Sequence, residues 1–542
     1  MKLIRSLTQL LFAAALGTGA LAGTAHAQAQ VQAQAPGADF KLAMSSPPNS
    51  MDPHFYNLFP NINVSDHMFE TLVKMNPDSQ PVPGLAESWR LVDELTWEFK
   101  LRRGVKFHDG TDLTAEDVAW SLDRPALIAN SPGKFDIYTR AIVSKQIVDA
   151  HTIRLKTASP YPLMLPDLTA IFIVSKKATA GALPQGLASD EFSSGKGMAG
   201  TGPFKFVRFA RDDRVELERF DGYWGAKPAW GKVTLRFIPS DPTRVAALLS
   251  GDVDAIENVP TPDLKRIREN SNLNFFSKVS HRMIYFNLDQ RDKTPFVFDN
   301  DGKPLDKNPL KDARVRKAMS LAVNREVIKD RVMEGLSLPT ANLVPPTLFG
   351  NNPTLKPVYD ADLARKLLAE AGYPNGFAVT FHGPNNRYVN DDQIMQTVAQ
   401  MWARIGIKAK VDAMPLAVYF PRAGVAKKEF SVTLVGWGAQ TGEASSPLRS
   451  LLACENKEKG LGGFNYPSYC NPKMDALLEE GLRTVDDKKR SALFQDAVKI
   501  AVDDAALVPI HHQVTTWAAK RAIDYVGRTD ERTYAHAFFP KR

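Results

Sequence analysis

The sequence predicts an α/β protein built from more than one domain, and three observations point to this class. The chain has 542 residues, which is more than one ordinary domain holds. A helical pattern over residues 391–405 runs directly into a strand pattern over 408–411, an order typical of a sheet covered by helices. The pattern of predicted strands and helices also changes near residues 71, 200 and 283, and these positions are candidate domain boundaries.

The N-terminus has the features of a secretory signal peptide. Lys2 and Arg5 form a basic start, residues 10–16 form a short apolar core, and Ala25-His26-Ala27 is a small-residue cleavage site. The alternative is a membrane anchor, but the strongly apolar part is too short to span a bilayer. We therefore expect a signal peptide over residues 1–27, cleavage after Ala27 and release into the periplasm, with the Gln/Ala-rich residues 28–38 as a disordered leader.

Composition and charge exclude several classes of protein. The chain is 44% hydrophobic and 24% charged, as folded globular proteins are. Its formal net charge is +8, but the basic residues are spread along the chain, and a representative short cluster, residues 311–317, contains an acid. Because no basic stripe could follow a phosphate backbone, a nucleic-acid partner is not expected.

The two cysteines, Cys454 and Cys470, lie 16 positions apart in a segment rich in Gly, Asn and Lys. An oxidising compartment favours a disulfide between them, and two free thiols are the alternative. A metal site is a weaker explanation, because two cysteines cannot complete a tetrahedral shell and no histidine stands nearby in the sequence. We expect the disulfide.

Local patterns in the first half of the chain predict mostly strands. Residues 96–101 alternate in the manner of a half-buried strand. Thr114 can cap a helix, and Asp117, three positions later, can bind the free amides of its first turn. A second helix is predicted to begin at Asp241 and to stop at Gly251. Further strands are predicted over residues 40–44, 204–209, 215–220 and 233–238.

The second half alternates helices and strands. Residues 314–331 are predicted as one long helix, because apolar residues recur on one face of it. The other predicted elements are the helix and strand over 391–405 and 408–411, a strand over 430–437 that ends in glycines, and helices over 473–482 and 488–502. The tail from about residue 513 is long enough to return to the first part of the chain.

A dense set of motifs lies between residues 84 and 118. It includes Gly84-Leu85-Ala86-Glu87-Ser88-Trp89, Phe107-His108-Asp109-Gly110 and Thr114-Ala115-Glu116-Asp117-Val118. Further motifs are Gly200-Thr201-Gly202-Pro203-Phe204, Ala322-Val323-Asn324-Arg325, Gly436-Trp437 and Cys470-Asn471-Pro472. In this order and spacing they resemble the extracellular solute-binding proteins of family 5, the dipeptide, oligopeptide, nickel and glutathione receptors of ABC importers.

The resemblance implies a fold and a set of partners. The implied fold is a class II periplasmic binding protein, an α/β fold of two lobes joined by a two-crossover hinge, with an inserted extra subdomain. Its expected parts are a discontinuous lobe I (39–73, 200–283 and 513–542), the inserted subdomain (74–199) and lobe II (284–512). The implied partners are a small-molecule or peptide ligand and the ABC permease and ATPase complex of the inner membrane, with the receptor itself a monomer.

The central candidate for ligand binding is Trp437. It ends an apolar strand between Gly436 and Gly438, so the backbone can approach a solute while the indole offers a flat wall; a core tryptophan is the alternative. In peptide-binding relatives an aspartate shortly after this Gly-Trp pairs with the ligand's ammonium group. This chain has Gln440 at that position, and we expect Glu443, the nearest carboxylate, to replace the aspartate.

The resemblance also suggests the remaining contacts. Arg387, with Tyr388 beside it, lies near the position where dipeptide-binding relatives hold an arginine for the ligand carboxylate; a solvated arginine ahead of a helix is the alternative. Tyr56 is a weaker candidate for a contact from lobe I. The run Thr441-Gly442-Glu443 followed by Pro447-Leu448-Arg449 is more similar to the glutathione-binding branch than to the dipeptide branch.

Enzyme motifs are missing from the sequence, and we expect no catalytic residue, metal or cofactor. GxSxG, HExxH, CxxC and P-loop strings do not occur. Residues 195–200 match GxGxxG, but a strand rather than a helix is predicted after them. Neighbours such as His511 and His512 in a strand point to opposite faces and cannot share a metal. His108 sits in a Phe-His-Asp-Gly turn, where turn hydrogen bonding is the expected role.

The sequence therefore predicts a receptor that captures a small peptide or a glutathione-like solute and delivers it to a permease. A non-peptide solute, such as an opine, a sugar or a metal chelate, is the main alternative. A secreted hydrolase without a linear motif and a ligand-binding module for a chemoreceptor are the others.

Overall fold

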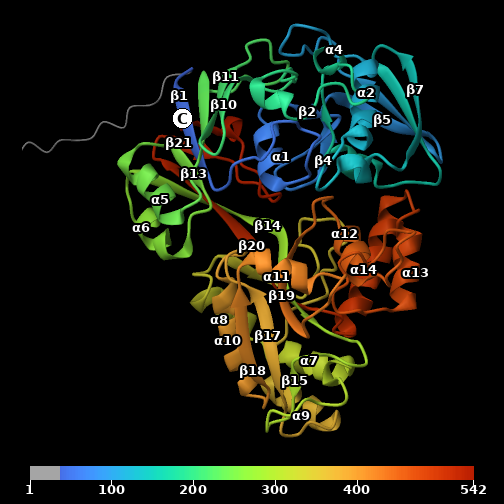
Figure 1. Ribbon diagram of the computed structural model, residues 1–542, viewed down its shortest axis with the longest axis vertical. Helices are drawn as coiled ribbons and strands as arrows, with labels where there is room; N and C mark the ends of the chain where they lie inside the picture. The colour runs from blue at the N-terminus through green and yellow to red at the C-terminus, as the bar shows by residue number, and fades with distance from the viewer. Residues whose placement is uncertain (1–36, 542) are drawn as a thin grey trace, which may run out of the picture.

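The computed structural model describes residues 37–541, so the predicted signal peptide and nearly all of the predicted leader lie outside the described residues. Its largest element is a twelve-stranded mixed sheet that runs through both lobes (Figure 1). In order of hydrogen-bonded neighbours, the strands are β10 (Phe204–Ala210), β11 (Arg214–Arg219), β12 (Lys232–Phe237), β1 (Asp39–Met44), β13 (Ala255–Glu257), β20 (Val508–Lys520), β14 (Leu273–Leu288), β19 (Val432–Gly438), β17 (Ala378–Pro384) and β15 (Val297–Phe298), with β16 (Ser337–Pro339) beside β20 and β18 (Lys408–Met414) beside β17. The predicted α/β class is confirmed. We use the predicted ranges as names for lobe I, the inserted subdomain and lobe II.

Two long strands, β14 and β20, connect the lobes. They pair antiparallel from Leu273 and Lys520 at one end to Phe286 and Val508 at the other. Figure 1 shows both strands passing from the upper part of the molecule to the lower part. The pairing register shifts between Val279 and Met283, as at a β-bulge, which bends a strand locally. The two-crossover hinge is therefore made from neighbouring strands of one sheet.

Lobe I is completed by the last residues of the chain. The Phe40 ring of β1 lies 4.7 Å from the Trp230 ring and 5.3 Å from that of Phe538, measured between centroids. Phe538 begins β22 (Phe538–Pro540), which pairs with β21 (Ile523–Tyr525). The C-terminal tail thus returns to lobe I. The helices of this lobe are α1 (Phe59–Ser65), α5 (Asp241–Ser250), which ends at Gly251 as predicted, and α6 (Leu264–Arg268).

The inserted subdomain is built on a four-stranded antiparallel sheet. Its strand order is β5 (Ala86–Asp93), β6 (Thr96–Leu101), β8 (Thr152–Thr157) and β7 (Ile142–Asp149). The predicted cap of α2 (Ala115–Leu127) is present, since the Thr114 amide donates to Asp117 Oδ2 at 2.9 Å. The smaller elements in and beside this sheet are β2 (Glu70–Thr71), β3 (Val73–Met75), β4 (Pro81–Pro83), α3 (Met164–Leu168), β9 (Phe172–Ile173) and α4 (Lys176–Thr179).

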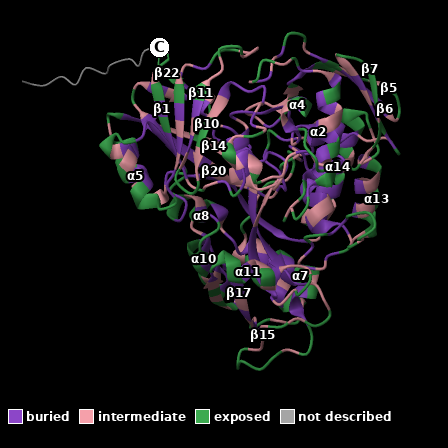
Figure 2. Ribbon diagram, turned by 45° about the horizontal axis from the view of Figure 1, so that its top comes forward, coloured by how far each residue is buried: buried purple, intermediate pink, exposed green. Residues whose placement is uncertain are grey.

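A buried ion pair ties the subdomain to the first strand-to-helix connection of lobe I. Arg124 of α2 donates to both carboxylate oxygens of Asp52, at 2.7 and 2.8 Å, and both side chains are fully buried. One hydrophobic core also runs through both parts, from Phe40 and Trp230 to Phe99 and Phe107. Lobe II has separate cores. Figure 2 shows buried residues along the central strands and exposed ones on the outer surfaces. Lobe I and the subdomain therefore form one packed unit.

The helices of lobe II cover its part of the sheet. They are α7 (Ala313–Leu321), α8 (Arg325–Arg331), α9 (Ala361–Glu370), α10 (Asp391–Ala403), α11 (Leu416–Ala423), α12 (Ser445–Pro447), α13 (Pro472–Gly481) and α14 (Asp487–Asp503). The prediction of one helix over residues 314–331 is wrong. The chain leaves the first helix after Leu321, and Asn324 starts a second one by accepting the Val327 amide at 3.1 Å.

The predicted disulfide between Cys454 and Cys470 is present. A cross-link over this short loop removes conformations of the unfolded chain, worth about 3 kcal/mol in the simplest model. We expect reduction to lower the free energy of unfolding by about that amount, measured by urea denaturation with and without a reductant. The Cys454→Ser/Cys470→Ser double variant is the control and should match the reduced protein. Two titratable thiols in unfolded, unreduced protein would contradict the prediction.

Candidate functional site

The segment that follows β19 lies against the inserted subdomain. Gln440, which is exposed, accepts a hydrogen bond from the Tyr138 hydroxyl at 3.4 Å. Gly442 has a positive φ of 72°, and a Cβ placed on it would lie 2.5 Å from the Ser79 carbonyl oxygen. A larger residue would collide with the backbone there. The loop predicted to bind the solute therefore lies where the two lobes meet.

Trp437 is half-buried at the end of β19 and packs on the core of lobe II. Its indole Nε1 donates to Ser446 Oγ at 3.1 Å, and its ring centroid lies 5.1 Å from that of Phe464. The indole nitrogen is thus occupied by a neighbour within lobe II. What remains for a solute is the uncovered part of the ring, which suits apolar contact better than hydrogen bonding.

The glycines beside Trp437 have a different role from the one predicted. A Cβ on Gly436 would lie 2.6 Å from a ring carbon of Tyr388, whose hydroxyl donates to the Gly436 carbonyl at 3.2 Å. A Cβ on Gly438 would lie 3.1 Å from His281 Nε2. The space that the sequence assigned to a solute is therefore filled by two side chains of the protein. Tyr388 is buried and packs against Gly436 of β19.

Arg387 is exposed at the start of the α10 region, with its guanidinium 5.0 Å from the Tyr388 ring. Its loop is held in place because the Asp391 carboxylate accepts the amides of both Arg387 and Tyr388 at 3.0 Å. Within the part of the chain that the structure describes, no carboxylate forms an ion pair with Arg387. The side chain is therefore available to an anion from outside.

Tyr56 packs on the subdomain. A Cβ on Gly133 would lie 2.9 Å from the Tyr56 ring, so glycine is needed at that position. The neighbour of this tyrosine, Asn57, makes the polar contact instead: its amide donates to the Tyr138 hydroxyl at 3.0 Å. Asn57, Tyr138 and Gln440 thus form a chain of hydrogen bonds from lobe I through the subdomain to lobe II. Asn57 and Tyr138 do not belong to any motif identified in the sequence, so the sequence analysis did not predict either residue.

Glu443 lies in the predicted loop, but its carboxylate already has a partner. The side chain is 2% exposed and accepts from Arg490 Nη1 at 2.7 Å and from the Ser445 hydroxyl. Arg490, on α14, is also buried and lies 4.2 Å from the Phe349 ring centroid. A buried carboxylate that is paired in this way holds the loop to α14 and has no free charge for a ligand.

A second buried carboxylate in this region was missed by sequence reasoning. Asp167 of α3 is 3% exposed, and the Tyr161 hydroxyl donates to it at 2.6 Å. Burial raises its pKa to about 7, the hydrogen bond from Tyr161 and the charge of Arg449 lower it, and the charge of Glu443 raises it. Arg449 and Glu443 belong to lobe II, so charges of that lobe act on the pKa of Asp167. The sequence signal that could have revealed Asp167 is its position as the one charged residue in the apolar run over 162–168.

Ion pairs from the C-terminal segment surround the hinge. Arg282 of β14 pairs with Glu531 at 2.7 Å, and Asp66 pairs with Arg532 at 3.1 Å. The Arg282 charge and hydrogen bonds outweigh burial and lower the pKa of Glu531 to about 2. Burial raises the pKa of Asp66 to about 6. Because Arg282 pairs opposite Gly438 in the sheet, these charges lie close to the end of β19.

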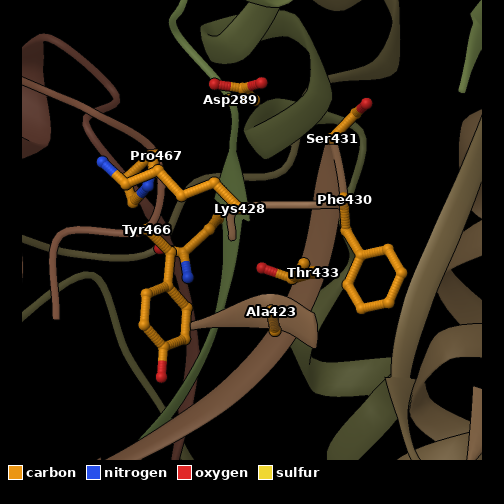
Figure 3. Close-up of a pocket in the computed structure, with 9 residues that line it drawn as sticks. Asp289, Ala423, Lys428, Phe430, Ser431, Thr433, Tyr466 and Pro467 are labelled. Carbon is orange, nitrogen blue, oxygen red and sulfur yellow. The ribbon is translucent and has the colours of Figure 1, made fainter. Parts of the chain in front are cut away.

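A cavity within lobe II does not qualify as the solute site. It lies beside β14 and β19 and is lined by Asp289, Lys428 and Tyr466, among others (Figure 3). Its volume is about 10 Å³, the space of a single water molecule. A peptide could not enter a cavity of this size.

The chain matches a family model described as "Bacterial extracellular solute-binding proteins, family 5 Middle" over residues 80–459. This chain is a family 5 solute-binding protein. It is 30% identical to the glutathione-binding protein GsiB of Salmonella choleraesuis over 479 residues, which covers 87% of this chain and 88% of the relative.

Solved structures of binding proteins share the fold. The ABC transporter-associated periplasmic binding protein DppA of Helicobacter pylori, in complex with a peptide, is 25% identical and superposes with a TM-score of 0.73, covering 93% of this chain and 98% of that one. HbpA2 of Haemophilus parasuis is 24% identical with a TM-score of 0.76, covering 93% and 100%. The predicted two-lobed periplasmic binding fold is confirmed for this solute-binding protein. Among residues 37–541, no helix is both long and apolar enough to cross a bilayer.

The sequence strings that resembled enzyme motifs have structural roles in this solute-binding protein. Residues 195–200 follow a short 3-10 helix and lead into β10, so no helix stands where a phosphate-binding turn needs one. His108 Nδ1 accepts the Gly200 amide at 3.3 Å and Nε2 lies 2.9 Å from the Gly202 oxygen, so the ring binds the segment ahead of β10 and not the backbone of its own turn. His511 and His512 are both buried in β20.

Proposed function

We propose that this chain is the periplasmic receptor of an ABC importer and captures a small peptide or glutathione-like solute between its lobes. After export and cleavage behind Ala27, the monomer delivers the solute unchanged to the permease and ATPase complex. One observation carries the proposal: the loop from Gly436 to Glu443 meets the inserted subdomain through Gln440 and Tyr138, with the unpaired Arg387 nearby on lobe II. The likeness to GsiB supports a glutathione-like ligand.

The hinge explains how capture is coupled to delivery. Because lobe II has its own cores and joins lobe I through β14 and β20, the lobes can rotate as rigid bodies about these strands. A solute that contacts both lobes stabilises the closed arrangement by its differential affinity for it. The permease then recognises the closed surface.

The candidate residues have separate roles in this proposal. Trp437 provides the apolar wall, and Arg387 binds a ligand carboxylate. Tyr388 positions Arg387 and supports Gly436 through its ring. Gln440 and Tyr138 close the contact between the lobes, with Tyr56 packed at its edge. Glu443 fixes the loop through Arg490.

Calorimetry with reduced glutathione and with the dipeptide Met-Leu tests the function. We expect one molecule bound per chain and recovery of the solute chemically intact. Arg387→Gln should weaken binding at least about tenfold, because a charged hydrogen-bond partner is lost. Arg483→Gln, which removes an exposed arginine elsewhere on lobe II, is the matched control and should change nothing.

Two outcomes would contradict this function. Steady product formation that survives repurification would show an enzyme. Binding of an opine, a sugar or a metal chelate, without binding of any peptide, would replace the ligand class.

A further inference from the structure

The strand β18 is a free edge of the twelve-stranded sheet. Among residues 37–541 it pairs with β17 alone, in parallel register. At one end of the pair the Lys408 amide donates to the Phe377 carbonyl at 2.9 Å, and at the other the Met414 carbonyl accepts the Asn385 amide at 3.1 Å. Because alternate residues of a parallel strand direct their amide and carbonyl at the same neighbour, the even-numbered residues of β18 bond to β17.

The odd-numbered residues of β18 turn their backbone away from β17. Ala409, Val411 and Ala413 have no hydrogen bond to their amides or carbonyls within the part of the chain that the structure describes. A row of such groups is a template for one more strand. The side chains of these three residues pack against the core of lobe II, so an added strand would extend the sheet and leave the core as it is.

A groove of about 700 Å³ lies along the first half of this edge. One wall is the side of α10 that carries Ala399 and Ala403, and the other is formed by β15, β17 and the start of β18, with Phe298 and Val379 in its lining. A volume of this size is that of a pocket for a small ligand, so it has room for the side chains of an added strand. None of the candidate solute-binding residues lines it.

The charge along this groove is positive. Lys408 and Lys410 are exposed on β18, and neither lies at ion-pair distance from a carboxylate among residues 37–541. The one acid in the lining, Asp299, accepts the backbone amides of Asp301 and Lys303 within its own turn. Because opposite charges on neighbouring strands stabilise the pair, this edge favours a strand with acidic side chains.

Two other occupants lack the required charge. A second β18 centred on this groove would place the lysines of the two copies opposite one another, and like charges directly opposite destabilise a strand pair. The residues that precede Gly37 include Lys2 and Arg5 and no acid, so this chain does not supply the segment from its own N-terminal sequence. The charge therefore points to another protein.

We propose that the edge of β18 binds an extended acidic segment of a partner protein, which adds a strand to the sheet of lobe II. Successive side chains of a strand point to opposite faces, so the segment carries acids at alternate positions, beside Lys408 and Lys410. The residues between the acids are small or apolar, because they lie beside Ala409 and the alanines of α10. This surface shares no residue with the candidate solute site, and the inference holds whichever solute is captured.

Fluorescence anisotropy with a labelled peptide of alternating glutamate and valine tests the charge of the edge. Lys408→Glu/Lys410→Glu should bind this peptide about tenfold or more weakly than the unsubstituted chain, because two attractive cross-strand pairs become repulsive. Lys473→Glu/Lys488→Glu, which makes the same charge change at two exposed lysines elsewhere on lobe II, is the matched control and should bind like the unsubstituted chain.

Two measurements on the unsubstituted chain do not depend on how a variant folds. Hydrogen exchange in residues 408–414, followed by mass spectrometry, should slow about tenfold or more at the free amides when the peptide is bound, because these amides gain acceptors. A peptide of the same composition, with its glutamates and valines in two separate blocks, should bind about tenfold more weakly, because it cannot place acids on one face only.

The results separate this inference from the proposed function. Absence of peptide binding, full binding by Lys408→Glu/Lys410→Glu, or protection confined to the loop from Gly436 to Glu443 overturns the edge site and leaves solute capture standing. A concentration-dependent dimer that the peptide dissociates overturns the acidic partner in favour of a second copy. If the chain binds no solute between its lobes but the peptide protects residues 408–414, the proposed function fails and the edge site stands.

Discussion

Glu443→Gln is expected to lower the free energy of unfolding by about 3–5 kcal/mol, because it leaves the buried Arg490 guanidinium without its carboxylate partner. Both side chains are buried, and Arg490 Nε has no hydrogen-bond partner among the described residues even with Glu443 present. The second carboxylate near Arg490, that of Asp487, is exposed and lies 3.2 Å away, so it offers little compensation. Urea denaturation at pH 7.5 measures the change.

An exposed pair on the same helix provides the matched control. Asp503→Asn removes the partner of Lys499, whose side chain is 52% exposed, and should cost less than about 1 kcal/mol. The double change Glu443→Gln/Arg490→Met removes both charges and should recover much of the loss. If Glu443→Gln leaves stability unchanged but abolishes glutathione binding, the carboxylate serves the ligand directly and our assignment of its role is wrong.

Stability is expected to fall steeply as the pH drops from about 6.5 toward 4. Burial lowers the pKa of His511 and His512 to about 3 and that of His54, His67 and His382 to about 4. These groups take up protons in the unfolded chain, near pH 6.5, but not in the folded one. Each therefore lowers the free energy of unfolding by about 1.4 kcal/mol per pH unit in this window.

Two carboxyl groups act in the opposite direction. The pKa values of Asp167 and Asp66 are raised to about 7 and about 6, so the folded chain takes up protons there before the unfolded chain does. Between pH 6 and 4 these two carboxyl groups offset part of the loss from the histidines, and stability still falls as the pH drops. Urea denaturation at pH 7.5, 6.0 and 5.0 measures the slope.

One histidine can be tested alone. His511 has no hydrogen-bond partner for either ring nitrogen among residues 37–541 and lies near the start of β20. His511→Leu should reduce the slope by about 1.4 kcal/mol per pH unit in the same range. An unchanged slope in this variant, or a flat profile in the unsubstituted chain, would contradict the assignment.

Features that depend on neighbouring residues in the sequence were predictable. The cap at Thr114 and Asp117 and the helix stop at Gly251 each involve backbone groups close to the motif residues or a glycine's local freedom. The long helix over 314–331 was wrong because apolar periodicity continued through Asn324, while its side chain capped a new helix.

Features of the site that depend on distant contacts were not predictable. Nothing next to Gly436 in the sequence indicates that Tyr388, 48 positions away, fills the space above it. The same holds for Glu443 and Arg490, which are 47 positions apart. The Asp167 carboxylate lacks any motif, and its burial depends on the packing of residues that are distant in the sequence.

The place of β22 in lobe I makes the core of that lobe depend on residues that lie far apart in the chain. The aromatic stack of Phe40, Trp230 and Phe538 joins residues from the beginning, the middle and the last few positions of the chain. The Trp230 indole donates to the Phe538 carbonyl at 2.7 Å, so this core is complete only when Phe538 is in place. A chain that lacks β22 would therefore leave this core of lobe I incomplete.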